Sequence, residues 1–161
     1  MTRPVACWIS AAVLAAVAAP ALAAAPAPPQ PDYHPSMGDL MTMAVQPRHI
    51  KLGVAGRQRN WSYATFEASE LKNAFARIAR TIPTYGKADT AAMMSTMIKD
   101  PLAALETAVK AHDARAFDTA YAEVTAACNA CHEAQDHGFV VIKAPDGAAY
   151  PDQDFRPKPG R

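Results

Sequence analysis

The stretch AYAEVTAACNACHEA, from Ala120 to Ala134, decides how the rest of the chain is interpreted. It contains no Pro or Gly and is rich in Ala, the strongest helix former, so it predicts a helix. On that helix Cys128 and Cys131 are three residues apart, and His132 follows Cys128 by four. Positions three and four apart share one helix face, so both thiols and the imidazole are expected to face the same way.

The order Cys-x-x-Cys-His at residues 128–132 is the attachment pattern for a c-type haem. Each thiol can form a thioether with one vinyl group of the porphyrin, and His132 can then bind the iron axially. Two alternatives are a zinc site and a redox dithiol. A zinc site usually needs a second Cys or His pair, and a thioredoxin-like dithiol usually lies in a βαβ unit; the sequence has neither pattern. We therefore predict one covalent haem c, held by Cys128, Cys131 and His132.

Residues 1–23 have the pattern of a secretory signal peptide. Arg3 gives a positive start, Ile9 to Ala19 is an apolar run, and Ala21-Leu22-Ala23 fits the small-residue cleavage rule. The apolar run is short for a membrane span and Pro20 closes it, so cleavage after Ala23 is expected rather than a membrane anchor. This predicts a periplasmic protein.

Cleavage would change both the cysteine count and the charge. Cys7 is lost with the signal, so both remaining cysteines belong to the haem motif. Loss of Arg3 leaves fifteen basic residues against fifteen acidic ones. Near-neutrality disfavours nucleic-acid binding, which usually needs a clustered basic face, and implies no strong electrostatic steering toward a charged partner.

The mature chain is long enough for one domain with one core. Residues 24–35 are Pro-rich and predict an extended leader. Ser36 to Asp39 resembles a capping box, which places a helix start there, and Pro47 should kink that helix or split it in two.

Three more long helices are predicted after the first, with a short helix before the third. Apolar residues recur at three and four from Trp61 to Ile82, with Glu67 among the polar residues on the other faces. A short helix over Asp89 to Ile98 precedes Asp100-Pro101, which resembles an N-cap followed by Pro at the first helical position. Asp113 is predicted to cap the fourth long helix, which carries the motif.

Four amphipathic helices with short loops predict an all-α fold, an antiparallel up-down-up-down four-helix bundle over residues 36–137. Residues 138–161 predict an irregular C-terminal tail in which Phe139 to Ile142 is a candidate strand. We hypothesise that this tail folds back over an exposed haem edge.

In that topology the start of the first helix and the loop between helices two and three lie at the haem end. All six methionines other than Met1 fall in these two places. A thioether suits the sixth position of a haem iron, and the alternative is that methionine only fills the core. Met41 is the first choice, Met37 the second and the segment Met93–Met97 the third.

The remaining histidines and cations are assigned weaker roles. His49 is interpreted as a polar or helix-end group, and His137 as a helix cap or a contact to a haem propionate. His34 and His112 are expected at the surface. Four cations could pair with propionates or simply form a solvated face: Arg48, Lys51, Arg57 and Arg59.

Together, the signal, the helical bundle and Cys128-x-x-Cys131-His132 near the C-terminus resemble the class II c-type cytochromes. These are the cytochrome c-prime group and its Met-ligated low-spin relatives, and the resemblance covers residues 36–137. It implies a four-helix bundle with His132 as proximal ligand, and in the Met-ligated relatives a Met early in helix one binds the iron. Leu40-Met41 occupies that place. The long tail and Pro47 depart from the pattern.

The predicted function is electron transfer by a soluble monohaem cytochrome that serves redox partner proteins and is not an enzyme. The alternative is a five-coordinate protein that binds NO or CO, in which Met41 only packs. A peroxidase would need a distal base and a cation near the iron, whereas Met and aliphatic residues are expected there. Members of the group often pair through their first two helices, so a homodimer stays open.

Overall fold

The computed structural model describes residues 32–147 and 150–158. The predicted signal peptide, residues 1–23, and the leader up to residue 31 lie outside the described residues. The chain divides into a unit that ends at Asp32 and a unit that begins at Tyr33, and all the helices described below belong to the second unit.

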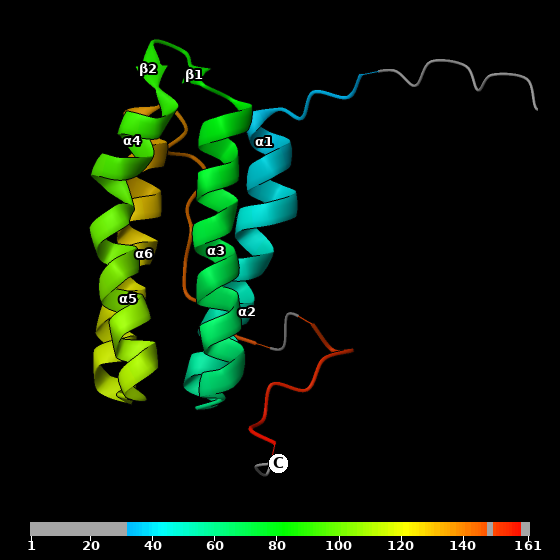
Figure 1. Cartoon of the computed structure of the whole chain (residues 1–161), viewed down its shortest axis with the longest axis vertical. Coiled ribbons are helices and arrows are strands. Elements are labelled where there is room, and N and C mark those ends of the chain that lie inside the picture. The colour runs from blue at the N-terminus through cyan, green and yellow to red at the C-terminus, as the bar shows by residue number, and fades with distance from the viewer. Residues whose placement is uncertain (1–31, 148–149, 159–161) are drawn as a thin grey trace, which may run out of the picture. The chain divides into compact units, whose positions relative to one another are not determined.

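This second unit is mostly helical, which confirms the predicted all-α class (Figure 1). Its helical segments are α1 (Met37–Leu40), the π-helical η1 (Met41–Val45), α2 (Gln46–Arg57), α3 (Trp61–Thr81), α4 (Thr90–Met97), α5 (Lys99–Ala111) and α6 (Ala114–Ala134). Two short strands, β1 (Thr84–Tyr85) and β2 (Ala88–Asp89), form an antiparallel hairpin between α3 and α4.

The first helical segment continues through Pro47 (Figure 1). The predicted capping box is confirmed, because Ser36 and Asp39 each accept the other's backbone N–H. In a regular α-helix a proline ring clashes with the carbonyl four residues earlier. Here η1 precedes Pro47 and widens the helix, so that the Gln46 N–H bonds the Met41 carbonyl five residues back. The predicted interruption is therefore a local change of helical type rather than a break.

α3 follows the predicted pattern except at one position. Asn60 caps it by accepting the Tyr63 N–H at 3.2 Å, and it ends before Pro83. The stripe is buried at Ala64, Ala68, Leu71, Phe75 and Ile78. Glu67, expected off the buried stripe, is only 1 % exposed. The reason is long-range: Nη1 of the half-buried Arg48 lies 3.3 Å from the Glu67 carboxylate and pairs with it.

The predicted N-cap at Asp100 is wrong. α4 is capped by Asp89, whose side chain accepts the Ala92 N–H at 2.7 Å. The chain then passes into α5 almost without interruption, since Ile98 bonds back to α4 and its carbonyl accepts the Leu102 N–H. Asp100 consequently lies inside the first turn of α5, where a carboxylate is favoured by the helix dipole.

α5 and α6 are joined by a tight turn at His112, whose φ of 56° is left-handed. Asp113 caps α6 as predicted, accepting the Ala116 N–H at 3.0 Å. His112 is at the surface as predicted and stacks on Trp61, with ring centroids 5.6 Å apart.

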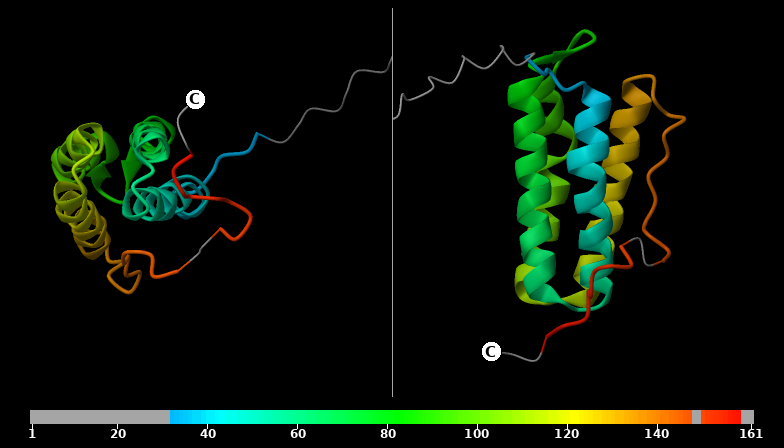
Figure 2. Two further views of the ribbon diagram at one scale, coloured as in Figure 1. Left: turned by 90° about the horizontal axis from the view of Figure 1, so that it is seen from below. Right: turned by 90° about the vertical axis from the view of Figure 1, so that its right-hand side faces the viewer.

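α2 packs on α3 and α6, and α5 packs on the same two helices (Figure 2). The residues most deeply enclosed between them include Leu52, Leu71, Leu105, Phe117 and Val124. Glycine allows the close approach of α2 to α6, because a Cβ at Gly56 would overlap the ring of Phe117. A Cβ at Gly53 would lie 2.5 Å from the hydroxyl of Tyr121.

The tail after α6 forms no helix or strand in its described residues, 135–147 and 150–158. The predicted strand at Phe139–Ile142 is absent: the chain turns there, and the Val140 N–H bonds the His137 carbonyl at 2.8 Å. The chain then runs back along the helices (Figure 2). Near its end Phe155, 8 % exposed, stacks on Tyr63 at 5.2 Å.

Candidate functional site

The C-terminal turns of α6 carry Cys128, Cys131 and His132. Both thiols are free and partly buried. Burial raises the pKa of the Cys128 thiol to about 11 and also raises the pKa of the Cys131 thiol. Both side chains are therefore neutral at pH 7. Reactive dithiols usually have a cysteine with a lowered pKa, whereas burial raises the pKa of both thiols here.

The imidazole of His132 is held by a backbone group of the tail. Its Nδ1 lies 2.7 Å from the carbonyl oxygen of Val140. A carbonyl only accepts, so Nδ1 carries a proton, and in the neutral imidazole Nε2 then keeps its lone pair. Histidines that bind metals usually donate their other ring N–H in this way. Sequence reasoning missed Val140, because a backbone carbonyl leaves no signature in the residue pattern.

A cavity of about 210 Å³ lies beside His132. Three parts of the chain meet at it. The first helical segment contributes Met37 and Met41; the hairpin and α4 contribute Tyr85, Met93 and Met94; and the end of α6 contributes Cys131 and His132. Cys128 does not line the cavity and packs against the hydrophobic core instead.

Four of the six candidate methionines therefore have side chains that line one cavity. Met37 and Met41 share it with His132, and Met93 and Met94 form another part of its wall. Met43 is 60 % exposed and, like Met97, is not part of the wall. The first-choice and second-choice candidates for the sixth ligand, Met41 and Met37, thus both line the cavity and lie one helical turn apart.

His49 does not reach this cavity. It is 4 % exposed between α2 and α6, with Nδ1 3.1 Å from the Tyr121 hydroxyl and Nε2 2.9 Å from the Thr125 hydroxyl. Desolvation lowers its pKa to about 4, so the ring is neutral at pH 7. Of the two interpretations the polar group is confirmed and the helix-end group is wrong, because His49 lies within α2 and the close approach of α2 to α6 encloses the ring.

His137 lies at the cavity with Tyr85. Its backbone N–H donates to the His132 carbonyl at 2.7 Å, just beyond the C-cap of α6 at Gln135. Its ring Nε2 is 3.2 Å from the Tyr85 hydroxyl. A contact from His137 to a propionate stays a prediction.

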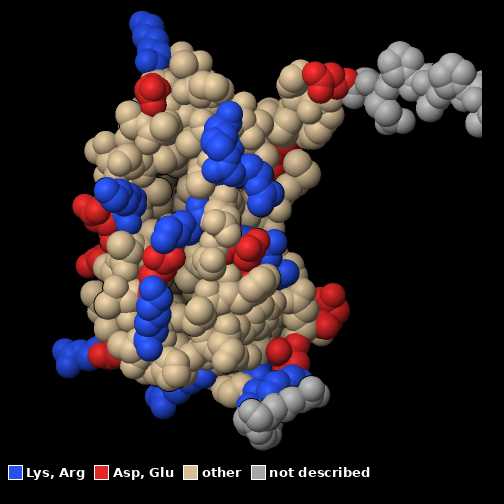
Figure 3. Space-filling model, viewed as in Figure 1, with Lys and Arg blue, Asp and Glu red and all other residues tan. Residues whose placement is uncertain are grey.

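None of the four cations considered for propionates lines the cavity. Arg48 pairs with Glu67, and it lies 3.6 Å from Glu70. Burial raises the pKa of the Glu67 carboxyl, and the charge of Arg48 opposes that rise. Lys51 lies over the ring of Tyr150, while Arg57 and Arg59 are exposed at the end of α2. On the face seen in Figure 3, side chains of both charges are spread over the surface.

No family model, no curated protein and no solved structure matches this chain. In the part of the chain that the structure describes, no helix is long and apolar enough to cross a membrane. Among the same residues, no three His, Cys, Asp or Glu side chains group to hold a metal ion.

Proposed function

We propose that the protein is a periplasmic monohaem c-type cytochrome that transfers electrons and catalyses no reaction of its own. The observation that carries this proposal is the shared cavity, which has a motif imidazole on one part of its wall and methionine thioethers on others. Imidazole and thioether are a recognised axial pair for haem iron, and this pair raises its potential.

We propose further that the helices form an antiparallel four-helix bundle. The segment α1–η1–α2 would be the first helix, α3 the second, α4–α5 the third and α6 the fourth. The packing of α2 and α5 on both α3 and α6 supports this arrangement. Such a bundle places the start of the first helix beside the end of the fourth, as the common cavity of Met41 and His132 requires.

The residues present fit a covalent haem. Cys128 and Cys131 are free thiols three residues apart on one helix, of which only Cys131 lines the cavity, and the neutral form of His132 keeps a lone pair on Nε2. A bound haem supplies an iron that accepts and releases one electron. The protein's part is to hold the group by two thioethers, to ligate through Nε2 of His132 and the sulfur of Met41, and to exclude water with an apolar wall.

The cavity is smaller than the roughly 300–1,000 Å³ typical of ligand pockets. A haem would therefore extend past the cavity into solvent or displace the walls. Met37, Met41 and Met93 are only partly buried, and methionine is flexible enough to adjust its shape to a neighbour. An exposed haem edge would also suit exchange of electrons with a partner protein.

Substitution of Met41 by Ala tests the sixth ligand. We expect the low-spin spectrum to become high-spin, and carbon monoxide to bind where it did not before. Met43→Ala is the matched control, because Met43 lies in the same η1 segment but is 60 % exposed and off the cavity. A low-spin spectrum in Met41→Ala would exclude Met41 and move the assignment to Met37 or the Met93–Met97 segment.

Gas binding is the second candidate function. The observation that favours it is that no Lys, Arg, Asp or Glu lines the cavity, whose wall is rich in methionine. If no sulfur binds the iron, this wall would surround an open position suited to an apolar diatomic molecule. High-spin iron that binds carbon monoxide in the unaltered protein would establish it.

A further inference from the structure

The described part of the C-terminal tail from Phe139 to Arg156, here called the strap, makes contacts that bear on His132. It begins with a reversal of the chain. The His137 N–H bonds the His132 carbonyl, and the Val140 N–H bonds the His137 carbonyl. This turn brings the Val140 carbonyl to within 2.7 Å of Nδ1 of His132, eight residues earlier in the chain.

Asn129, one turn before His132 on α6, fixes the next part of the strap. Its side-chain amide donates to the Ile142 carbonyl at 2.9 Å, and its side-chain oxygen accepts the Ile142 N–H at 2.7 Å. A pair of bonds to one residue sets both the distance and the register of the strap against α6. Val140, two residues earlier, is thereby held beside the imidazole.

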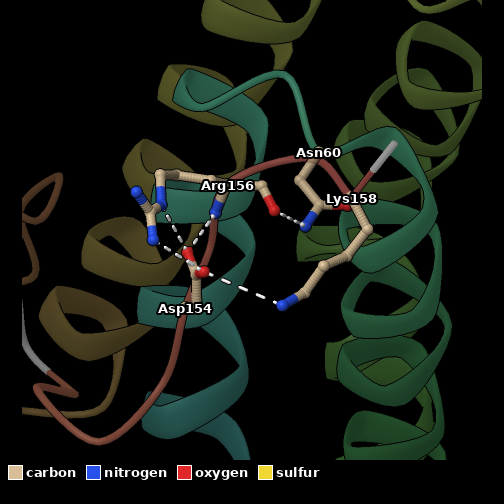
Figure 4. Close-up of polar contacts among 4 residues, drawn as sticks. All are labelled: Asn60, Asp154, Arg156 and Lys158. Carbon is tan, nitrogen blue, oxygen red and sulfur yellow. Dashed lines mark hydrogen bonds and ion pairs between the residues drawn. The ribbon is translucent and has the colours of Figure 1, made fainter. Parts of the chain in front are cut away.

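The far half of the strap is tied to other helices. The Pro145 carbonyl accepts a bond from Arg57 of α2, and the Tyr63 hydroxyl of α3 donates to Gln153 at 2.6 Å. Asn60 donates to the Arg156 carbonyl at 3.2 Å, where Asp154 accepts from the same residue's guanidinium (Figure 4). The strap is thus anchored at both ends and cannot drift away from α6 without breaking several contacts.

We propose that the strap is a positioning element for the proximal ligand: it orients the His132 ring, fixes its tautomer and makes Nε2 more electron-donating. This inference rests on the proposed function. A hydrogen bond from Nδ1–H to a carbonyl raises the basicity of the other ring nitrogen. A more basic ligand favours ferric over ferrous iron, so the strap lowers the reduction potential.

The test weakens the strap without altering a ligand. Asn129→Ala removes both bonds to Ile142, and Asn73→Ala removes the same side chain from an exposed position on α3 as a control. Loss of the hydrogen-bond partner of a ligating histidine costs about 10- to 100-fold in metal affinity, and this is the upper limit for Asn129→Ala, which loosens the Val140 carbonyl without removing it. If the affinity for ferric iron alone falls tenfold, the reduction potential rises by about 59 mV. Asn73→Ala should keep the wild-type potential.

A potential in Asn129→Ala equal to that of wild type would overturn the proposal. If Asn129→Ala does not fold, Ile142→Pro replaces it, because proline has no N–H to donate to the Asn129 side chain. A wild-type potential in Ile142→Pro would likewise overturn the proposal. A second measurement needs no haem. Nitrogen NMR of the chain produced without haem attachment should show the Nδ1–H form of His132 in the wild type and more of the Nε2–H form in Asn129→Ala.

The two measurements separate the two claims. A chain that never acquires haem but shows the Nδ1–H form refutes the proposed cytochrome and leaves the strap's hold on His132 intact. A haem protein whose haem-free form keeps its helical circular dichroism yet shows mainly Nε2–H refutes the strap and leaves the cytochrome intact.

Discussion

Gly56→Ala should destabilise the fold, although glycine is normally the weaker residue inside a helix. Replacing Gly by Ala in a helix interior gains about 1 kcal/mol. Here the added Cβ would overlap three ring carbons of Phe117, which is 1 % exposed and cannot swing into solvent. Overpacking costs about 1–3 kcal/mol, and an overlap with a buried ring belongs at the upper end. The net loss is about 2 kcal/mol.

Urea unfolding followed by circular dichroism measures this loss. Gly38→Ala is the matched control, because its Cβ would lie 3.7 Å from the Ser36 hydroxyl, an ordinary contact. The control should be unchanged or gain up to about 1 kcal/mol. If Gly56→Ala is as stable as the control, α2 and α6 do not approach as described, and the placement of Met41 relative to His132 loses its support.

Two further perturbations test the interior and the tail. The unfolded chain binds a proton near the ordinary His pKa of 6.5, whereas His49 in the fold does so only near 4, so stability should fall as pH drops from 6.5 to 4. The free energy of unfolding lost through His49 is about 3 kcal/mol. If the stability of His49→Gln falls with pH as steeply as that of the wild type, this assignment is refuted. Phe155→Ala should detach the end of the tail from Tyr63 and raise the rate of protease cleavage after residue 145 by about tenfold, since cleavage follows the opened population. Val141→Ala, altered at a 73 % exposed side chain, should leave cleavage unchanged, and equal rates in both variants would contradict the packing of Phe155.

Sequence reasoning succeeded where the deciding interactions are local. The caps at Ser36 and Asp113 each satisfy an N–H three residues ahead, and the stripe of α3 repeats within single turns. These signals lie in short windows of sequence. They also placed the motif correctly on the C-terminal part of α6.

It failed where distant segments decide the outcome. Glu67 is buried because Arg48, nineteen residues earlier, neutralises it. His49 is enclosed by Tyr121, more than seventy residues away. The Val140 carbonyl reaches His132 only because the chain reverses after α6. Patterns within one helix carry no information about such partners. The helix through Pro47 was misjudged for another reason, since a π-helical segment was not considered as a way to accommodate proline.

The absorption spectrum of the purified, exported protein, oxidised and reduced, with and without carbon monoxide, tests the central claim most directly. If the protein is a cytochrome with two axial ligands, we expect a covalently bound haem with a low-spin spectrum that carbon monoxide does not change. A high-spin spectrum that responds to carbon monoxide would keep the haem and replace electron transfer by gas binding. A protein without haem absorbance would contradict the assignment of Cys128, Cys131 and His132.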